Sequence, residues 1–371
     1  MTKANRKSAK LQLIYPGKTE EKKILRKKAA GKITPAVRKK NTLSDSFFSG
    51  DNFPVLQHLV PLLEGKVDLI YIDPPFGTGK DFHDIDNDTA YSDKLTDAAF
   101  LEFLRVRLIL LRECLSPGGS ICLHIDKKAG HYVKLIMDEV FGQRNFLNDI
   151  TRVKCNPKNF ARNAYGNYSD MILFYAKKRD RNIFNETGDM LTKKEEESFF
   201  RKIHPVHGRY TTNPLHAPGE TANGDTGRKW KGLLPPKGRH WRYSRKELDR
   251  LDKAGLIEWS DSNNPRKIVF AKGHKGKKVQ DVWEFKDKGL SFSDYPTQKN
   301  HELLKRIILH STNPGSLVLD AFAGSGGTLL VAHQLGRHFI GIDASKKSQA
   351  VVRKTLKEGK VPCSFYKHIG G

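Results

Sequence analysis

The chain has 371 residues, of which 37% are hydrophobic and 29% charged, and it contains no run of about 18 apolar residues that could cross a membrane. Its 66 lysines and arginines outnumber 41 aspartates and glutamates, and the net charge of +25 favours a polyanionic partner, above all nucleic acid. The four cysteines, Cys114, Cys122, Cys155 and Cys363, form no CxxC pair, so we expect neither disulfides nor a structural zinc site but a soluble protein of the reducing cytoplasm.

The first 44 residues form a lysine-rich leader, which we expect to be a mostly disordered or partly helical basic arm. Residues 1–45 hold 14 lysines and arginines against 3 acidic residues. An arm with this charge would add non-specific, salt-sensitive affinity for nucleic acid. The leader lacks the apolar core of a secretory signal.

An α/β pattern begins at residue 45. The predicted elements are a short strand at 47–48, a helix over 54–63, a buried strand over 67–72, a helix over 97–115, a turn at 117–119 and a buried strand over 120–125. Helices that alternate with short, doubly apolar strands predict a parallel sheet covered on both faces.

Residues 150–294 differ in composition from the α/β part: they are basic, rich in aromatics, glycine and proline, and lack a regular hydrophobic pattern. This change in composition predicts an inserted module. This segment contains all four tryptophans: Trp230, Trp241, Trp259 and Trp283. Basic and aromatic side chains suit phosphate contact and base stacking. The densest cluster, GRHWRYS, makes Arg239, His240 and Arg242 the predicted nucleic-acid contacts, acting collectively.

The α/β pattern resumes after residue 295. The predicted elements are a helix, a strand over 317–322, a glycine loop, a second helix and a strand over 338–343. The loop AFAGSGGT leads into a helix N-terminus, which lets a ligand approach the backbone closely. It matches neither a P-loop nor GxGxxG. Asp343 ends the next strand, where an acid commonly binds ribose hydroxyls. A nucleoside-containing cofactor fits, and a tight structural turn at Gly324, Gly326 and Gly327 is the alternative.

The stretch YIDPPF, residues 71–76, raises a second chemical possibility. Asp73 lies just past the end of a buried strand, where open α/β sheets place ligands. The two prolines fix the backbone and hold the carbonyls of Asp73 and Pro74 as aimed acceptors, which suits a substrate amino group. Phe76 offers a flat face for a base turned out of a duplex. A rigid turn capped by a core phenylalanine is the alternative for this motif alone.

Three motifs together, DPPF at 73–76, YPTQKN at 295–300 and FAGSGGT at 322–328, resemble those of the amino-group DNA methyltransferases, which methylate adenine N6 or cytosine N4 from S-adenosylmethionine. Their order is similar to that of the β class, with the catalytic motif first, the target-recognition region next and the cofactor loop last. The layout resembles the Mod subunits of type III restriction-modification systems, and the resemblance covers residues 45–355.

The resemblance implies an S-adenosylmethionine-dependent methyltransferase fold, with a Rossmann-like, mostly parallel sheet. Residues 45–149 would form the catalytic part, 150–294 a target-recognition insert and 295–371 the cofactor-binding part. The implied catalytic residues are Asp73, Pro74, Pro75 and Phe76. The implied cofactor contacts are Asp51 on the adenine, Thr297 and Lys299 near the methionine carboxylate, Asp343 on the ribose, and Asp73, Asp320, Phe322, Ala323, Gly324, Ser325 and Gly326.

The resemblance also implies a reaction without a metal or a covalent enzyme intermediate. A motif that begins with aspartate is typical of adenine N6 transfer in flipped-out duplex DNA, whereas serine is typical of cytosine N4. We therefore predict a site-specific adenine DNA methyltransferase, with cytosine N4 as the alternative. Two departures are Phe76, which keeps the stacking face of the usual tyrosine, and Asn300, which replaces the usual proline after Lys299.

Other functions remain open at this point. A cysteine nucleophile for cytosine C5 would have to be Cys363, which lies after the cofactor loop without supporting motifs. An RNA or protein methyltransferase and a non-catalytic DNA-binding homologue are the remaining alternatives. The expected partner is double-stranded DNA in the bacterial cytoplasm, near the nucleoid. A homodimer and a separate restriction subunit or nuclease stay open, as does the recognition sequence.

Overall fold

The computed structural model describes residues 12–36, 43–75, 81–83, 89–92, 97–156, 163–221, 223–261, 263–286 and 299–370. The chain folds as two compact units. Unit 1 is formed by Met1–Glu186 together with Gln280–Gly371, and unit 2 is formed by Thr187–Val279. Among the described residues, no helix is long and apolar enough to cross a membrane.

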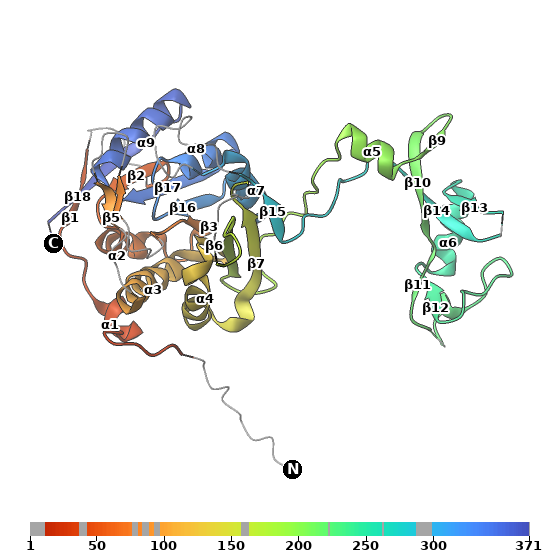
Figure 1. The fold of residues 1–371 in the computed structure, drawn as a ribbon, viewed down its shortest axis with the longest axis horizontal. Helices are drawn as coiled ribbons and strands as arrows, with labels where there is room; N and C mark the ends of the chain where they lie inside the picture. Colours follow the sequence, from red (N-terminus) through yellow and green to blue (C-terminus); the bar gives the residue numbers. More distant parts are fainter. Residues whose placement is uncertain are drawn as a thin grey trace, which may run out of the picture. The chain divides into compact units, whose positions relative to one another are not determined.

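Unit 1 is built on a ten-stranded, mostly parallel sheet (Figure 1). In spatial order its strands are β1 (Lys32–Pro35), β18 (Ser364–Ile369), β2 (Ser46–Ser49), β17 (His338–Asp343), β16 (Leu317–Asp320), β3 (Val67–Ile72), β6 (Leu115–Ile125), β8 (Ser169–Ala176), β7 (Phe146–Val153) and β15 (Val282–Glu284). The neighbours from β18 to β6 run parallel, while β1, β8 and β7 add antiparallel pairs. The predicted fold class is confirmed.

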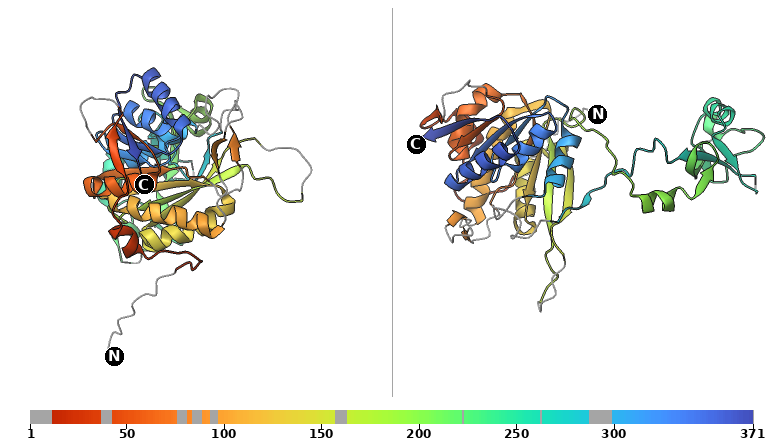
Figure 2. Two further views of the ribbon diagram at one scale, coloured as in Figure 1. Left: turned by 90° about the vertical axis from the view of Figure 1, so that its left-hand side faces the viewer. Right: turned by 90° about the horizontal axis from the view of Figure 1, so that it is seen from above.

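Helices cover both faces of this sheet (Figures 1 and 2). One face carries α2 (Asn52–Leu63), α3 (Asp97–Cys114) and α4 (Lys127–Phe141), and the other carries α7 (His301–Ser311), α8 (Gly327–Gln334) and α9 (Lys346–Glu358). In α3 the buried residues Phe100, Leu104, Leu108 and Leu111 recur every three or four positions, which gives the helix one apolar face. Two short strands, β4 (Asp81–His83) and β5 (Thr89–Ser92), pair with each other, and a 3-10 turn, η1, spans Gln143–Asn145.

The predicted turn at residues 117–119 is not a break between elements. Strand β6 continues through it, and the pairing with β3 shifts register between Val67↔Leu115 and Leu69↔Ser120. The extra residues therefore form an irregularity inside the strand. A Cβ at Gly119 would lie 2.6 Å from the carbonyl oxygen of Val67, so this close backbone approach requires glycine.

The described part of the basic leader, residues 12–36, contains a helix, in agreement with the partly helical alternative, but it packs against unit 1 and is not a disordered arm. Helix α1 (Glu21–Arg26) lies against α3, and β1 pairs with β18. The Tyr15 hydroxyl donates to Glu102 at 2.8 Å, and the buried Arg105 donates to both Glu102 and the carbonyl of Thr19. Residues 1–11 lie outside the described part.

Unit 2 has a small core of its own. A four-stranded antiparallel sheet contains β13 (Ile257–Trp259), β14 (Pro265–Phe270), β10 (Gly208–Pro214) and β9 (Lys202–His204), and a second sheet pairs β11 (His216–Pro218) with β12 (Arg239–Trp241). The remaining elements are α5 (Lys193–Phe199), α6 (Arg245–Lys253) and the turn η2 (Asp225–Gly227). Leu215, Trp230, Trp241 and Leu248 form the buried cluster, with the Trp259 ring stacked on that of Trp230 at 5.7 Å.

The boundaries of unit 2 are narrower than the predicted insert of 150–294. Strands β7, β8 and β15 pair within the large sheet, so residues 150–186 and 280–286 belong to unit 1. Trp283, which lies on β15, consequently belongs to unit 1 and not to the insert.

Candidate active site

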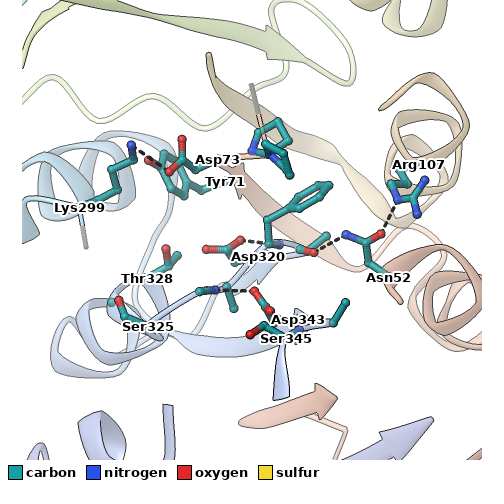
Figure 3. A pocket seen from close by; sticks show the side chains of 18 of the residues that line it. Asn52, Tyr71, Asp73, Arg107, Lys299, Asp320, Ser325, Thr328, Asp343 and Ser345 are labelled. Carbon is teal, nitrogen blue, oxygen red and sulfur yellow. Dashed lines mark hydrogen bonds and ion pairs between the residues drawn. The ribbon is translucent and has the colours of Figure 1, made fainter. Parts of the chain in front are cut away.

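Four adjacent parallel strands of unit 1 end beside one cavity of about 540 Å³ (Figure 3). Asp73 follows β3, Asp320 and Asp343 end β16 and β17, and Asp51 follows β2. The carboxyl ends of parallel strands meet at one edge of a sheet, which is where α/β proteins bind ligands. The cavity has a volume in the range of small-molecule and cofactor sites.

The glycine loop between β16 and α8 forms one wall. Gly324 has φ 52° and Gly326 has φ 81°, which is the left-handed region that favours glycine. The backbone N–H of Gly324 donates to Asp343 Oδ2 at 2.8 Å, and the N–H of Ser345 donates to Asp343 Oδ1 at 2.8 Å. Burial raises the pKa of the Asp343 carboxyl, and these two donors oppose that shift. Asp343 thus fixes the loop while lining the cavity.

Asp320 lies at the centre of the same wall and is almost completely buried. Its Oδ1 accepts a hydrogen bond from the N–H of Phe322 at 3.0 Å. Burial raises the pKa of Asp320 to about 7, the negative charges of Asp73 and Asp343 add to the shift, and a hydrogen bond with Thr328 opposes it. A cation in the cavity would therefore favour the ionised form of Asp320.

The opposite wall comes from α2 and α3. The Asn52 side chain donates to the carbonyl of Ala321 at 2.6 Å and accepts from Arg107 (Figure 3). Arg107 also pairs with Asp51 Oδ1 at 2.7 Å, and its guanidinium lies 3.6 Å from the centre of the Phe103 ring. Burial lowers the pKa of Arg107, and the Asp51 charge opposes this. The chain of contacts ties both helices to the glycine loop.

Sequence reasoning missed Asn52, Phe103 and Arg107 as cavity residues. Asn52 directly follows the predicted Asp51, and a charged residue inside the apolar run of α3 was a usable signal for Arg107. Asp51 itself lines the cavity, caps α2 through the N–H of Phe53 at 2.9 Å and is more than half exposed.

Asp73 and Lys299 form an ion pair at the carboxyl end of β3. Lys299 Nζ lies 2.9 Å from Asp73 Oδ2, and both side chains are largely buried. The second oxygen, Asp73 Oδ1, is buried and has no hydrogen-bond partner among the described residues. A buried carboxylate oxygen without a donor is costly. This oxygen is therefore placed to accept a hydrogen bond from a ligand.

Asn300, which replaces the proline that usually follows the lysine in the family motif, has a structural explanation. Asn300 is the N-cap of α7, and its Oδ1 accepts from the N–H of Glu302 at 2.9 Å. Its Nδ2 donates to the carbonyl of Lys286 at 2.9 Å. The backbone φ of −61° is one that proline could also adopt, so asparagine adds side-chain bonds without changing the direction of the chain.

The structure brings most of the predicted site residues of unit 1 together. Those that line the cavity are Asp51, Asp73, Pro74, Pro75, Lys299, Asp320, Phe322, Ala323, Gly324, Ser325 and Asp343. Gly326 lies behind the loop as the N-cap of α8, where a Cβ would be 3.2 Å from Val352. Phe76 and Thr297 lie outside the described residues.

The three predicted nucleic-acid contacts lie in unit 2, around the β11–β12 pair. Arg239 Nη1 is 3.0 Å from His216 Nδ1, and Arg242 Nε donates to the carbonyl of His216 at 3.1 Å. Arg266 donates to Thr212, and its charge, with those of Arg239 and Arg242, acts on His216. No described carboxylate forms an ion pair with any of these three arginines. His240 Nδ1 is 2.8 Å from the carbonyl oxygen of Gly219.

Taken together, the sheet and its strand-end cavity define a Rossmann-like α/β protein with a ligand site at the carboxyl edge. A family model described as DNA methylase, for the N6 and N4 methyltransferases, matches residues 67–354. The chain belongs to this DNA methylase family. Its fold is accordingly that of the methyltransferases, and the family predicted from the motifs is confirmed.

Two relatives agree with this assignment. The chain is 41% identical to the type II methyltransferase M.EcaI of Enterobacter cloacae, over 96% of this chain and 80% of that protein. It is 30% identical to the type III restriction-modification enzyme StyLTI Mod subunit of Salmonella typhimurium, over 85% of this chain and 55% of that subunit. The solved M1.HpyAVI–SAM complex is 19% identical with a TM-score of 0.46, and the match covers 84% of this chain and 98% of that one.

Proposed function

We propose that the chain transfers a methyl group from S-adenosylmethionine to the exocyclic N6 of adenine, within a specific sequence of duplex DNA and with the target base flipped out of the helix. The observation that carries this proposal is the pair of acceptors at the end of β3. Asp73 Oδ1 is buried without a donor among the described residues, and the Pro74 carbonyl follows it on a backbone fixed by two prolines. An exocyclic amino group has two hydrogens to offer such a pair.

The cavity also fits the cofactor. S-adenosylmethionine supplies an electrophilic methyl group on a positively charged sulfur, next to an ammonium and a carboxylate. Asp320 and Asp73 would face the positive charges, Lys299 the carboxylate and Asp343 the ribose hydroxyls. Each Asp343 oxygen accepts one backbone N–H, and the Ser348 side chain also bonds the carboxylate, whose remaining lone-pair capacity is left for a ribose hydroxyl. Asp51, whose carboxylate is more than half exposed, would accept a hydrogen bond from the amino group of the cofactor's adenine.

Asp73 and Pro74 act on the exocyclic amino nitrogen of the target base. This nitrogen is a poor nucleophile because its lone pair is delocalised into the ring. Hydrogen bonds to Asp73 and to the Pro74 carbonyl favour the pyramidal form, in which the lone pair is available. The ion pair with Lys299 holds the carboxylate in place. The nitrogen forms a bond to the methyl carbon as the methyl–sulfur bond breaks, and it then loses one proton, for which Asp73 is an acceptor. Alignment of the two reactants supplies much of the rate.

Aspartate at the start of the motif favours adenine as the target base. The same two acceptors would serve the amino group of cytosine N4, which makes that base the second candidate. Both bases are flipped out before reaction in enzymes that modify them, and unstacking costs a few kcal/mol.

Unit 2 is the proposed DNA-binding module. It carries 21 lysines and arginines against 11 aspartates and glutamates, and the arginine cluster around His216 offers three guanidinium groups to phosphates. StyLTI, one of the relatives, is a restriction-modification Mod subunit, which suggests a restriction subunit as a partner for this chain as well. A second copy of the chain is the other candidate partner.

Product identification tests the proposal. The protein is incubated with S-adenosylmethionine and unmethylated duplex DNA, the DNA is digested, and the nucleosides are identified by mass spectrometry, with Asp73→Ala as the control. We expect N6-methyladenine from the wild type alone. N4-methylcytosine would overturn the choice of base, and no modified nucleoside on a wide set of sequences would overturn DNA methylation as the activity.

A further inference from the structure

Arg107 is a buried arginine on α3 that bonds one wall of the cavity at three points. Its Nη2 donates to Asp51 Oδ1 at 2.7 Å, and its Nη1 donates to the carbonyl of Phe103 at 2.8 Å. Its Nε donates to Asn52 Oδ1 (Figure 3). The three residues that accept these hydrogen bonds all line the cavity, as Arg107 itself does.

Stability alone gives little reason for an arginine at this position. Burial lowers the pKa of Arg107, and among the described residues Asp51 is the one carboxylate that forms an ion pair with it. Removing an ion pair from water is costly, and apolar residues of similar volume often stabilise a core by as much or more. The contacts of Arg107 therefore call for an explanation in the cavity that they surround.

Asp51 is held through one of its two carboxylate oxygens. Both the N–H of Phe53, at 2.9 Å, and Nη2 of Arg107, at 2.7 Å, donate to Oδ1. Oδ2 accepts no hydrogen bond from the residues that the structure describes. Since the side chain is more than half exposed, the helix-cap bond from Phe53 would be its single restraint without Arg107. Arg107 thus fixes a carboxylate that keeps one oxygen available as an acceptor.

The surroundings of this acceptor suit a flat, apolar ring. The Phe103 and Phe322 rings both line the cavity, with their centres 6.1 Å apart. The Arg107 guanidinium lies 3.6 Å from the centre of the Phe103 ring, and Asn52 joins the same wall to the carbonyl of Ala321 at 2.6 Å. Aromatic faces next to a fixed acceptor fit a purine that carries an amino group.

We propose that Arg107 is a positioning residue that makes the cofactor site selective for adenine. It holds Asp51 so that Oδ2 accepts a hydrogen bond from the amino group at C6 of the base, and a carbonyl oxygen at C6 would be repelled there. The inference rests on the placement of the cofactor's adenine at Asp51 in the proposed function. It adds a residue of α3 that lies outside the family motifs.

Binding of two cofactor analogues tests this selectivity without any methyl transfer. S-adenosylhomocysteine has an amino group at C6 of its base, whereas S-inosylhomocysteine has a carbonyl oxygen there and a proton on N1. Calorimetric titration gives the ratio of the two Kd values. We expect the wild type to bind the adenosyl compound about 10- to 100-fold more tightly, and Arg107→Met to lower this ratio by about fivefold or more.

A double-mutant cycle asks whether Arg107 acts through Asp51. We expect Asp51→Ala to lower the ratio at least as much as Arg107→Met, and the double variant to keep the ratio of Asp51→Ala. Losing the bond to Asn52 weakens both analogues alike and leaves the ratio unchanged. A wild-type ratio in Arg107→Met, even with weaker binding of both compounds, would overturn the inference, as would a further fall from Asp51→Ala to the double variant.

Arg105→Met is the matched control. Arg105 is buried on the same helix and donates to Glu102 at 2.9 Å, but it does not line the cavity. Its loss should lower the melting temperature and leave the ratio unchanged. An equal fall of the ratio in this control would mean that general destabilisation causes the effect and would overturn the inference.

Arg107→Lys serves if Arg107→Met does not fold. It keeps the charge, but a single nitrogen cannot replace the guanidinium nitrogens that bond Asp51 and Asn52. We therefore expect a ratio below that of the wild type, and a wild-type ratio in this variant would overturn the inference.

The same titrations separate this inference from the proposed function. A wild type that binds both analogues equally would overturn the placement of adenine at Asp51, and the role of Arg107 with it. A preference that Asp51→Ala abolishes and Arg107→Met retains would overturn the role of Arg107 alone. Failure to form a methylated nucleoside would instead overturn the proposed reaction, whatever the ratio.

Discussion

The cavity of unit 1 and the surface of unit 2 carry opposite charge within one chain. Four aspartates, Asp51, Asp73, Asp320 and Asp343, line the cavity, against Lys299 and Arg107. Unit 2 exposes a surplus of arginine and lysine, with three guanidinium groups around His216. Unit 2 contributes +10 of the net charge of +25, and unit 1 contributes the remaining +15 despite its acidic cavity. A cationic cofactor favours an acidic pocket, whereas the DNA-binding surface that we propose for unit 2 has to be basic, so the two regions carry opposite charge.

The largest effect on ligand binding is expected at the acidic cavity, from Asp343→Ala. This change removes the acceptors of two backbone N–H groups, at Gly324 and Ser345, and each unsatisfied group costs about 1–3 kcal/mol. We expect cofactor affinity, measured by calorimetric titration, to fall about 10- to 100-fold, with DNA affinity unchanged.

Asp45→Ala is the control for that change. Asp45 accepts from the N–H of Phe339 at 3.2 Å and lies 2.9 Å from His338, at the opposite end of β17. Its loss should lower the melting temperature but leave cofactor affinity intact. Equal loss of cofactor affinity in both variants would contradict a specific role for Asp343.

The next effect is expected at the basic surface, from the double variant Arg239→Ala/Arg242→Ala. If each arginine contacts one phosphate, the slope of log affinity against log salt should fall by about 2, and affinity near physiological salt by about tenfold. Fluorescence anisotropy across a salt series measures both. Arg250→Ala, which removes an arginine already paired with Glu247 at 2.7 Å, should change neither. An unchanged salt slope in the double variant would refute the assignment.

A third prediction concerns pH. Because the pKa of Asp320 is about 7, cofactor affinity should rise about tenfold between pH 6 and pH 8 as the carboxylate ionises. This folded-state pKa is above the value of the unfolded chain, so the same group lowers the free energy of unfolding as pH rises from about 4 to 7. Titrations of wild type and Asp320→Asn measure the effect, and a pH dependence that persists in the variant would rule out Asp320 as its source.

The smallest effect is expected from the leader. Tyr15→Phe removes one partly buried hydrogen bond to Glu102 and should lower the free energy of unfolding by about 1 kcal/mol in urea denaturation. Cofactor and DNA affinity should stay the same, since residues 12–36 are part of the fold of unit 1. A loss of DNA affinity without a loss of stability would instead support the prediction that this segment is a DNA-binding arm.

The sequence predicted the acidic cavity better than it predicted the limits of the two units. Asp73, Asp320 and Asp343 could be found because each follows an apolar strand run at a recognisable motif. Asn52 and Arg107 could not be assigned to the cavity in the same way, since their contacts with Ala321 and Asp51 join segments far apart in sequence.

The outer strands of the large sheet were assigned to the insert for a similar reason. Strand β7 contains Arg152 and β8 contains Asp170, both buried, and a buried charge argues against a core strand when it is read alone. The two residues face each other across the β7–β8 pairing, and that compensation exists only in the folded sheet.

Single-turnover methyl transfer at saturating S-adenosylmethionine and saturating unmethylated duplex DNA tests the separation of the two regions most directly. It compares wild type, Asp73→Asn and Arg239→Ala/Arg242→Ala. Because saturation removes differences in affinity, we predict that Asp73→Asn slows transfer by about 10²–10³-fold or more, while the arginine variant keeps a rate near that of wild type. A normal rate in Asp73→Asn, or an equal loss in both variants, would contradict the account.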